Sequence, residues 1–208
     1  MEKNTIVFDL GGVIINLNVP RCVENFKRLM GEDNVRNILG IDDEGEGVVA
    51  VSAANRQLMH DYEYGNITTD EFLSTLQQYC CAGTTIEQIR EAWMSMLADL
   101  PQAKLDYIAS LREKGYKTVL LSNSNEMHWD PIFEQYHLDR YFDVIFASHH
   151  LHMAKPNQEM FDYVVREANI DSAHTIYVDD LDKNRAAGER FAGWQTCASI
   201  DELKTSIS

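Results

Sequence analysis

The sequence predicts an α/β protein in which helices cover both faces of a parallel sheet, with a helical segment inserted after the first strand. Two patterns support this fold class. Over residues 98–208, short apolar runs that end in polar residues alternate with helical segments, as in repeated β-α units. Between the first apolar run and this region, residues 17–97 show helical periodicity without strand signals.

Each predicted strand is an apolar run bounded by polar or glycine-rich turns. The first run covers residues 5–8, ends at Asp9 and is followed by Gly11 and Gly12, which indicates a buried strand that stops at a turn. A helix predicted after Pro101 ends before a glycine, a residue favoured after helix C-termini. The remaining elements are strands at 118–121, 144–147, 175–178 and 194–198, and helices at 102–114, 158–168 and 182–191.

The inserted segment predicts a separate helical domain. Thr68 and Glu71 have the spacing of a capping box ahead of the apolar Phe72. An insertion directly after the first strand leaves the sheet at the edge where open α/β sheets bind ligands. We therefore expect a core domain of residues 1–16 plus 98–208 and a helical cap of residues 17–97 that covers the active site.

Composition excludes several classes of partner. The chain has 208 residues, of which 33 are Asp or Glu and 18 are Lys or Arg, so its formal net charge of −15 disfavours nucleic acid and anionic membranes. No apolar run approaches the roughly 20 residues that span a bilayer. The 4 cysteines lack Cys-x-x-Cys spacing. We expect reduced thiols and a cytoplasmic location. Nothing in the sequence indicates an oligomeric state.

Polar side chains follow four of the predicted strands. In chain order they are Asp9, Ser122 with Asn123, Lys155 after a loop, and Asp179 with Asp180. Because the carboxyl ends of parallel strands meet at one edge of a sheet, we expect these side chains to converge. Three carboxylates around one cavity repel each other unless a cation lies among them, and an oxygen-only ligand set favours Mg²⁺ over zinc. Mg²⁺ and the lysine would neutralise a phosphoryl group, whose oxygens Ser122 and Asn123 would bind.

Four short segments in this order resemble the motifs of the haloacid dehalogenase superfamily. They read FDLGGVI, LLSNSN, AKP and VDDLDKN, and they span nearly the whole chain. The inserted helices resemble the C1 cap of that superfamily, as in its sugar-phosphatase-like members with an FDLG start and in the N-terminal phosphatase-like domains of epoxide hydrolases. The resemblance implies a Rossmann-like core and a Mg²⁺-dependent hydrolase of a small phosphorylated metabolite, with sugar phosphates as the favoured substrate class.

The resemblance also implies a role for each motif residue. Asp9 is implied as the nucleophile that forms an aspartyl-phosphate, which water then hydrolyses. Ser122, followed by Asn123, matches the phosphate-binding position. Lys155 matches the lysine that holds both the nucleophile and the phosphate, so it counts as catalytic and phosphate-binding.

The same resemblance implies the metal ligands. Asp180 aligns with the principal acidic ligand, and Asp9 and the backbone carbonyl of Gly11 complete the protein ligands. Asp179 either supports the lysine or reaches the metal through water. Asn184, four residues after Asp180, is expected to tie this loop together.

One departure from the family pattern stands at Gly11, where phosphatases of this superfamily usually carry a second Asp as general acid and base. We expect a preference for phosphates with stabilised leaving groups, or another proton donor, for which His128 is one candidate. Two alternatives stay open: a dehalogenase-type hydrolase in which Asp9 attacks carbon, and a catalytically weak binding protein.

A cluster of three histidines leaves a further metal site open. His149, His150 and His152 could share a transition metal on an extended segment, although polar loop residues are the simpler interpretation.

Overall fold

The computed structural model describes residues 4–39 and 53–207, and its core is a five-stranded parallel sheet. The strand order is β3-β2-β1-β4-β5, which places β1 at the centre between β2 and β4. The strands are β1 (Thr5–Phe8), β2 (Lys117–Ser122), β3 (Val144–Ala147), β4 (Thr175–Val178) and β5 (Gln195–Cys197). The predicted fold class is confirmed, and all five strands lie within a residue or two of their predicted positions.

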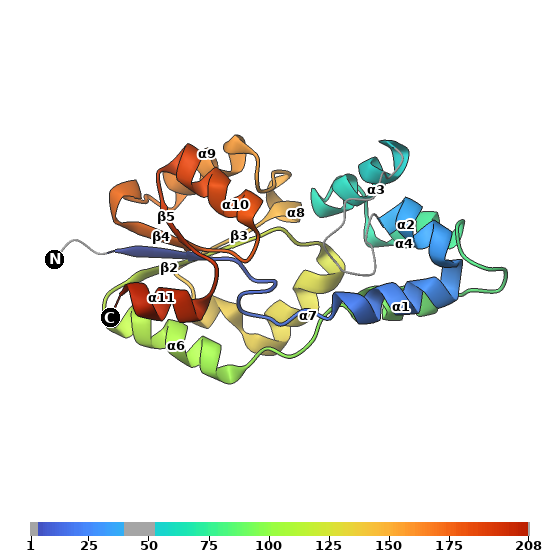
Figure 1. Ribbon diagram of the computed structural model, residues 1–208, viewed down its shortest axis with the longest axis horizontal. Helices are drawn as coiled ribbons and strands as arrows, with labels where there is room; N and C mark the ends of the chain where they lie inside the picture. The colour runs from blue at the N-terminus through green and yellow to red at the C-terminus, as the bar shows by residue number, and fades with distance from the viewer. Residues whose placement is uncertain (1–3, 40–52, 208) are drawn as a thin grey trace.

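Helices cover both faces of this sheet (Figure 1). Alternate residues of β1 point to opposite sides, so Ile6 and Phe8 pack against one helical layer and Val7 against the other. The first layer consists of α6 (Gln102–Glu113), α7 (Glu126–Tyr136) and α11 (Ile200–Ser206). The second contains α9 (Gln158–Glu167) and α10 (Asp182–Ala187), with the short α8 (Ser148–Leu151) after β3.

One predicted helix is shorter than expected. Regular α-helix ends at Ala187, and a π-helical turn, η3 (Gly188–Ala192), completes the segment predicted as helix to residue 191. Two 3₁₀ turns, η1 (Leu138–Arg140) and η2 (Ser172–His174), precede β3 and β4.

The inserted helices form a second hydrophobic cluster beyond the carboxyl end of the sheet (Figure 1). They are α1 (Val19–Met30), α2 (Glu32–Leu39), α3 (Ala53–Glu63), α4 (Thr69–Gln77) and α5 (Ile86–Met94). Phe26, Phe72 and Trp93 pack edge to face at its centre. The capping box predicted at Thr68 and Glu71 is present at the start of α4. Residues 40–52 of the predicted cap lie outside the described residues.

Two extended segments connect these helices to the core and pair with each other. Leu17 and Leu97 form an antiparallel bridge, and Asn16 N donates to Asp99 O at 2.9 Å while Ala98 N donates to Asn16 O at 3.0 Å. We propose that this paired connection divides the chain into a core of residues 1–16 plus 98–208 and a cap of residues 17–97.

Among the described residues, no helix is long and apolar enough to cross a membrane. The four cysteines, all described, form no disulfide.

Candidate active site

Asp9 lies at the carboxyl end of the central strand. Its N–H donates to Val178 O at 2.8 Å, and its Oδ1 accepts from Leu10 N at 2.7 Å, so the main chain orients the carboxylate. The turn that follows contains Gly12 at φ +75°, where a Cβ would lie 2.2 Å from Asp180 Oδ2. Position 12 therefore requires glycine for two reasons, the left-handed backbone conformation and the close approach of Asp180.

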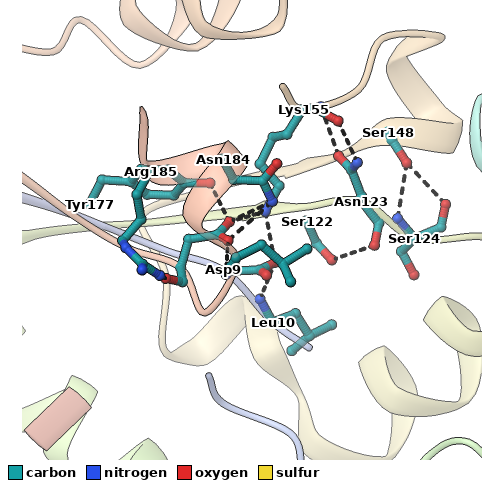
Figure 2. A network of polar contacts seen from close by, with 12 residues as sticks. Asp9, Leu10, Ser122, Asn123, Ser124, Ser148, Lys155, Tyr177, Asn184 and Arg185 are labelled. Carbon is teal, nitrogen blue, oxygen red and sulfur yellow. Dashed lines mark hydrogen bonds and ion pairs between the residues drawn. The ribbon is translucent and has the colours of Figure 1, made fainter. Parts of the chain in front are cut away.

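Lys155 joins two carboxylates in the buried interior of the site. Its Nζ lies 2.9 Å from Asp9 Oδ1 and 2.7 Å from Asp179 Oδ2. The side chain of Asn123 holds the lysine backbone at both ends: Lys155 N donates to Asn123 Oδ1 at 2.9 Å, and Asn123 Nδ2 donates to Lys155 O at 2.8 Å (Figure 2). The loop after β2 thus fixes the position of a lysine 32 residues further along the chain.

Asp179 is fully buried, and hydrogen bonds saturate its carboxylate. Oδ2 accepts from Lys155 Nζ and from the hydroxyl of Tyr177, and Oδ1 accepts from Leu181 N at 2.9 Å. Asn184 Nδ2 lies within 3.2 Å of both oxygens, so Asn184 ties this loop together as expected. These contacts suit Asp179 to holding the lysine.

The site carries more negative than positive charge. Burial raises the pKa of Asp9 to about 7, the nearby Asp179 raises it further, and Lys155 opposes both effects. Burial also raises the pKa of Asp180, with Asp179 adding to the effect. Burial lowers the pKa of Lys155, but Asp9 and Asp179 more than offset this and raise it overall, so the lysine stays charged.

The three carboxylates fit a hard divalent cation. Asp9, Asp179 and Asp180 each offer one oxygen, and these oxygens all lie within 4.8 Å of one another. Among the described residues, no nitrogen or sulfur ligand joins this group. An oxygen-only set beside a fixed lysine matches Mg²⁺ in ligand chemistry, and a cation would relieve the carboxylate repulsion.

A cavity of about 250 Å³ lies next to this cluster, between core and cap. Its lining includes Leu10 and Gly11 of the turn after Asp9 and the polar loop from Ser122 to Asn125. Most of its remaining wall is apolar, with Trp93 and Met96 of the cap among the lining residues. The buried Ser122 hydroxyl is directed at its neighbour's carbonyl, 3.3 Å from Asn123 O. The carboxylates and Lys155 are not themselves among the lining residues, but Leu10 and Asn123, which are hydrogen-bonded to Asp9 and Lys155, are, so the cavity adjoins the carboxylate cluster.

A family model of haloacid dehalogenase-like hydrolases matches residues 3–191. The chain belongs to this family of hydrolases. The family recognised from the four motifs is thus confirmed, and the match covers both the motif residues and the inserted helices.

Individual haloacid dehalogenase-like proteins resemble this chain over almost its whole length. D-ribitol-5-phosphate phosphatase from Bacteroides thetaiotaomicron is 32% identical over 202 residues, which cover 94% of this chain and 91% of the relative. A family enzyme from the same organism, solved in complex with magnesium and inorganic phosphate, is 32% identical with a TM-score of 0.77 and coverages of 94% and 93%. A predicted hydrolase of the family from Porphyromonas gingivalis is 28% identical with a TM-score of 0.81 and coverages of 100% and 98%.

Among the described residues of this haloacid dehalogenase-like hydrolase, His149, His150 and His152 do not form a metal site. His149 is buried, and burial lowers its pKa to about 4, with His150 adding to the effect. His152 contacts Tyr64 O through Nδ1 at 2.7 Å. These side chains belong to the contact between core and cap.

His128 lines the cavity but is held by the cap. Its Nε2 lies 3.1 Å from Trp93 O, and its ring stacks on the Trp93 indole at 5.4 Å between centroids. Burial lowers its pKa to about 4, so the ring is neutral near pH 7 and Nε2 donates its hydrogen to the Trp93 carbonyl. This geometry disfavours His128 as the missing proton donor.

The sequence-based predictions missed Glu63, at the end of α3. Its Oε1 accepts from Asn123 Nδ2 at 2.6 Å, and it lines the cavity together with Gly11 and Ser122. No local sequence pattern marks Glu63; in the structure Gly65, two residues later, has φ +67° and lies so close to His149 O that a Cβ would be 2.2 Å away. This tight contact brings the end of α3 against the core.

Proposed function

We propose that this hydrolase is a Mg²⁺-dependent phosphomonoesterase that acts on a small phosphorylated metabolite through an aspartyl-phosphate on Asp9. The observation that carries the proposal is the buried ion pair of Asp9 with Lys155, 2.9 Å apart, at the sheet edge where Asp180 and Ser122 also lie. A nucleophilic carboxylate, a fixed cation and hydroxyl and amide donors together supply what phosphoryl transfer needs.

Each residue has a distinct role in this proposal. Asp9 attacks phosphorus through the carboxylate oxygen that the lysine leaves accessible. Lys155 orients Asp9 and neutralises the charge of the phosphoryl oxygens. The Ser122 hydroxyl binds one of these oxygens. Because the side-chain amide of Asn123 bonds Lys155 and Glu63, the phosphate contact of Asn123 is made by its main-chain N–H.

The metal ligands follow from the oxygen donors around Asp9. Asp9, Asp180 and the carbonyl of Gly11 would hold Mg²⁺, and the saturated Asp179 would reach it only through water. Bound there, Mg²⁺ supplies a positive charge that brings the phosphate and the Asp9 carboxylate together. The magnesium prediction is supported by the solved magnesium and phosphate complex of the 32% identical family enzyme.

The substrate class is a phosphorylated sugar or polyol. The cavity of about 250 Å³ limits the substrate to a small molecule, and its apolar walls suit the C–H faces of a short carbon chain. The 32% identity to D-ribitol-5-phosphate phosphatase across 94% of this chain supports pentitol and pentose phosphates as the first candidates.

Neither alternative from the sequence is favoured by an observation. A dehalogenase would need an apolar halide cradle, whereas the side chains around Asp9 include Lys155 and Asp180. A binding protein would not need a nucleophile whose carboxylate is held in place by a main-chain N–H and a buried lysine.

Hydrolysis of p-nitrophenyl phosphate by the wild type and by Asp9→Asn, each with Mg²⁺ and with EDTA, tests the proposal. We expect activity only in the wild type with Mg²⁺, because the aryl leaving group needs no acid. D-ribitol 5-phosphate and pentose 5-phosphates then rank the natural substrate classes by released phosphate. Wild-type inactivity towards every phosphate, or chloroacetate hydrolysis without metal, would overturn the proposal.

A further inference from the structure

The position of the missing general acid is filled by an apolar neighbour. A Cβ on Gly11 would lie 3.3 Å from Leu17 Cδ1, and Gly11 and Leu17 line the same cavity. The Asp9 turn therefore presents no proton donor to the leaving group. An enzyme that hydrolyses alkyl phosphates needs an acid at this place, worth about 10²- to 10⁴-fold in rate, so another side chain must supply it.

Three ionisable side chains line the cavity among the described residues: Tyr62, Glu63 and His128. Tyr62 is buried, its hydroxyl pairs with Thr69 Oγ1 at 3.0 Å, and burial raises its pKa. His128 is neutral and donates to a main-chain carbonyl. Glu63 is partly exposed, and its side chain reaches the phosphate-binding loop.

Glu63 is held at both its main chain and its side chain. Its carbonyl accepts from the Ser148 hydroxyl at 2.7 Å, and that hydroxyl in turn accepts from Ser124 N at 2.9 Å. Glu63 Oε1 accepts from Asn123 at 2.6 Å. Because Ser122 and Asn123 bind the phosphate in the proposed function, the carboxyl group of Glu63 lies on the cap side of the phosphate position, and its Oε2 is the oxygen that can exchange a proton.

We propose that Glu63 is the general acid and base of this enzyme, carried by the cap in place of an acid at Gly11. The inference rests on the proposed phosphatase function. In the first step an Asp9 oxygen bonds to phosphorus, the bond from phosphorus to the leaving oxygen breaks, and protonated Glu63 gives its proton to that oxygen. In the second step the Glu63 carboxylate takes a proton from water, whose oxygen bonds to phosphorus as the bond to Asp9 breaks.

The surroundings of Glu63 suit both steps. Burial raises its pKa, which favours the protonated form that the first step requires. Lys183 and Lys155 oppose this effect, as do His60 and the hydrogen bond from Asn123, so the carboxylate form also remains accessible for the second step. Tyr64, on the same segment, also interacts with Glu63: burial raises the pKa of the tyrosine, and Glu63 raises it further.

The test compares an alkyl and an aryl phosphate in the wild type and in Glu63→Gln. Gln can keep the hydrogen bond from Asn123 through Oε1 and removes only the proton transfer. We expect kcat for D-ribitol 5-phosphate or glycerol 3-phosphate to fall by about 10² to 10⁴. With p-nitrophenyl phosphate, the variant should give a p-nitrophenolate burst at the wild-type rate, followed by slow turnover, because only hydrolysis of the aspartyl-phosphate still needs Glu63.

Two further variants keep the result interpretable. Glu126→Gln is the matched control. Glu126 belongs to the core and also contacts the cap, where its Oε2 accepts from the Thr69 hydroxyl at 2.6 Å, but it lies outside this cavity. This variant should keep wild-type activity on both the alkyl and the aryl phosphate. Glu63→Asp retains the acid with a shorter reach and should recover part of the alkyl activity lost in Glu63→Gln.

Three results would overturn the assignment. Wild-type kcat for the alkyl phosphate in Glu63→Gln would mean that no proton comes from this residue. An aryl burst slowed as much as the alkyl reaction would mean that Glu63 only positions Asn123, and a Glu63→Asp variant less active on the alkyl phosphate than Glu63→Gln would mean that side-chain length matters and acidity does not. Inactivity of the wild type towards both substrates would instead refute the proposed function itself.

Discussion

Gly12→Ala tests how closely the Asp9 turn and Asp180 depend on each other. The new Cβ would lie 2.2 Å from Asp180 Oδ2, whereas ordinary contact begins at 3.4 Å, so Asp180 or the turn must move by about 1.2 Å. The residue would also keep φ near +75°, at a cost of roughly 1–2 kcal/mol for a side chain in the left-handed region. Misplacement of a reacting or ligating group by 1 Å costs about 10²-fold in rate.

Gly193→Ala is the matched control. Gly193 has φ +70°, and its Cβ would meet no atom within 4 Å, so it carries the same backbone strain without the overlap. We expect both variants to lower Tm by about 2–8 °C. Only Gly12→Ala should lose about 10²-fold in kcat for p-nitrophenyl phosphate and need more Mg²⁺ for half-maximal activity. Equal activity losses in the two variants, or wild-type Mg²⁺ dependence in Gly12→Ala, would refute the reasoning.

Three more predictions concern charge in the site and the cap contact. Lys155→Met removes the cation that pairs with two buried carboxylates, so the free energy of unfolding of the metal-free protein in urea should fall by about 3–5 kcal/mol. A fall of less than about 1 kcal/mol would contradict the buried pairing. Mg²⁺ at 100 times its Kd should raise Tm by about 5–10 °C, and Asp180→Asn should abolish most of that gain in differential scanning fluorimetry. Burial lowers the pKa of His128 in the folded protein to about 4, below the ordinary 6.5 of the unfolded chain. Between pH 6.5 and 4, His128 is therefore protonated in the unfolded chain but neutral in the folded protein. Unfolding free energy should therefore fall by up to about 3 kcal/mol as pH drops from 6.5 to 4, and His128→Gln should flatten this slope in urea titrations at several pH values.

The sheet could be predicted because its strands are buried on both faces. Residues 5–8 and 175–178 are therefore short apolar runs with polar ends, a pattern that needs no tertiary information. The end of α10 could not be predicted in this way. The π turn begins at Gly188, where a Cβ would lie 2.7 Å from Tyr177 Cδ1, so this turn packs closely against β4, a tertiary contact that the local sequence does not encode.

The candidate site likewise contains residues that the sheet places predictably and contacts that depend on tertiary packing. Asp9 and Asp179 directly follow β1 and β4, and a parallel sheet brings such positions together whatever the loops do. The side-chain contacts of Asn123 depend instead on two placements that no local pattern encodes. One is the loop that contains Lys155, and the other is the docking of Glu63, 60 residues away, by the cap.

The double engagement of Asn123 has a consequence for substrate discrimination. The same amide nitrogen donates to Glu63 of the cap and to the backbone of Lys155 in the core. A bulky ligand in the cavity would keep the end of α3 away from the core and so break the hydrogen bond between Asn123 and Glu63. Asn123 would then hold Lys155 less firmly. Such a ligand could still occupy the phosphate site, and selection against it would then appear in turnover rate more than in affinity.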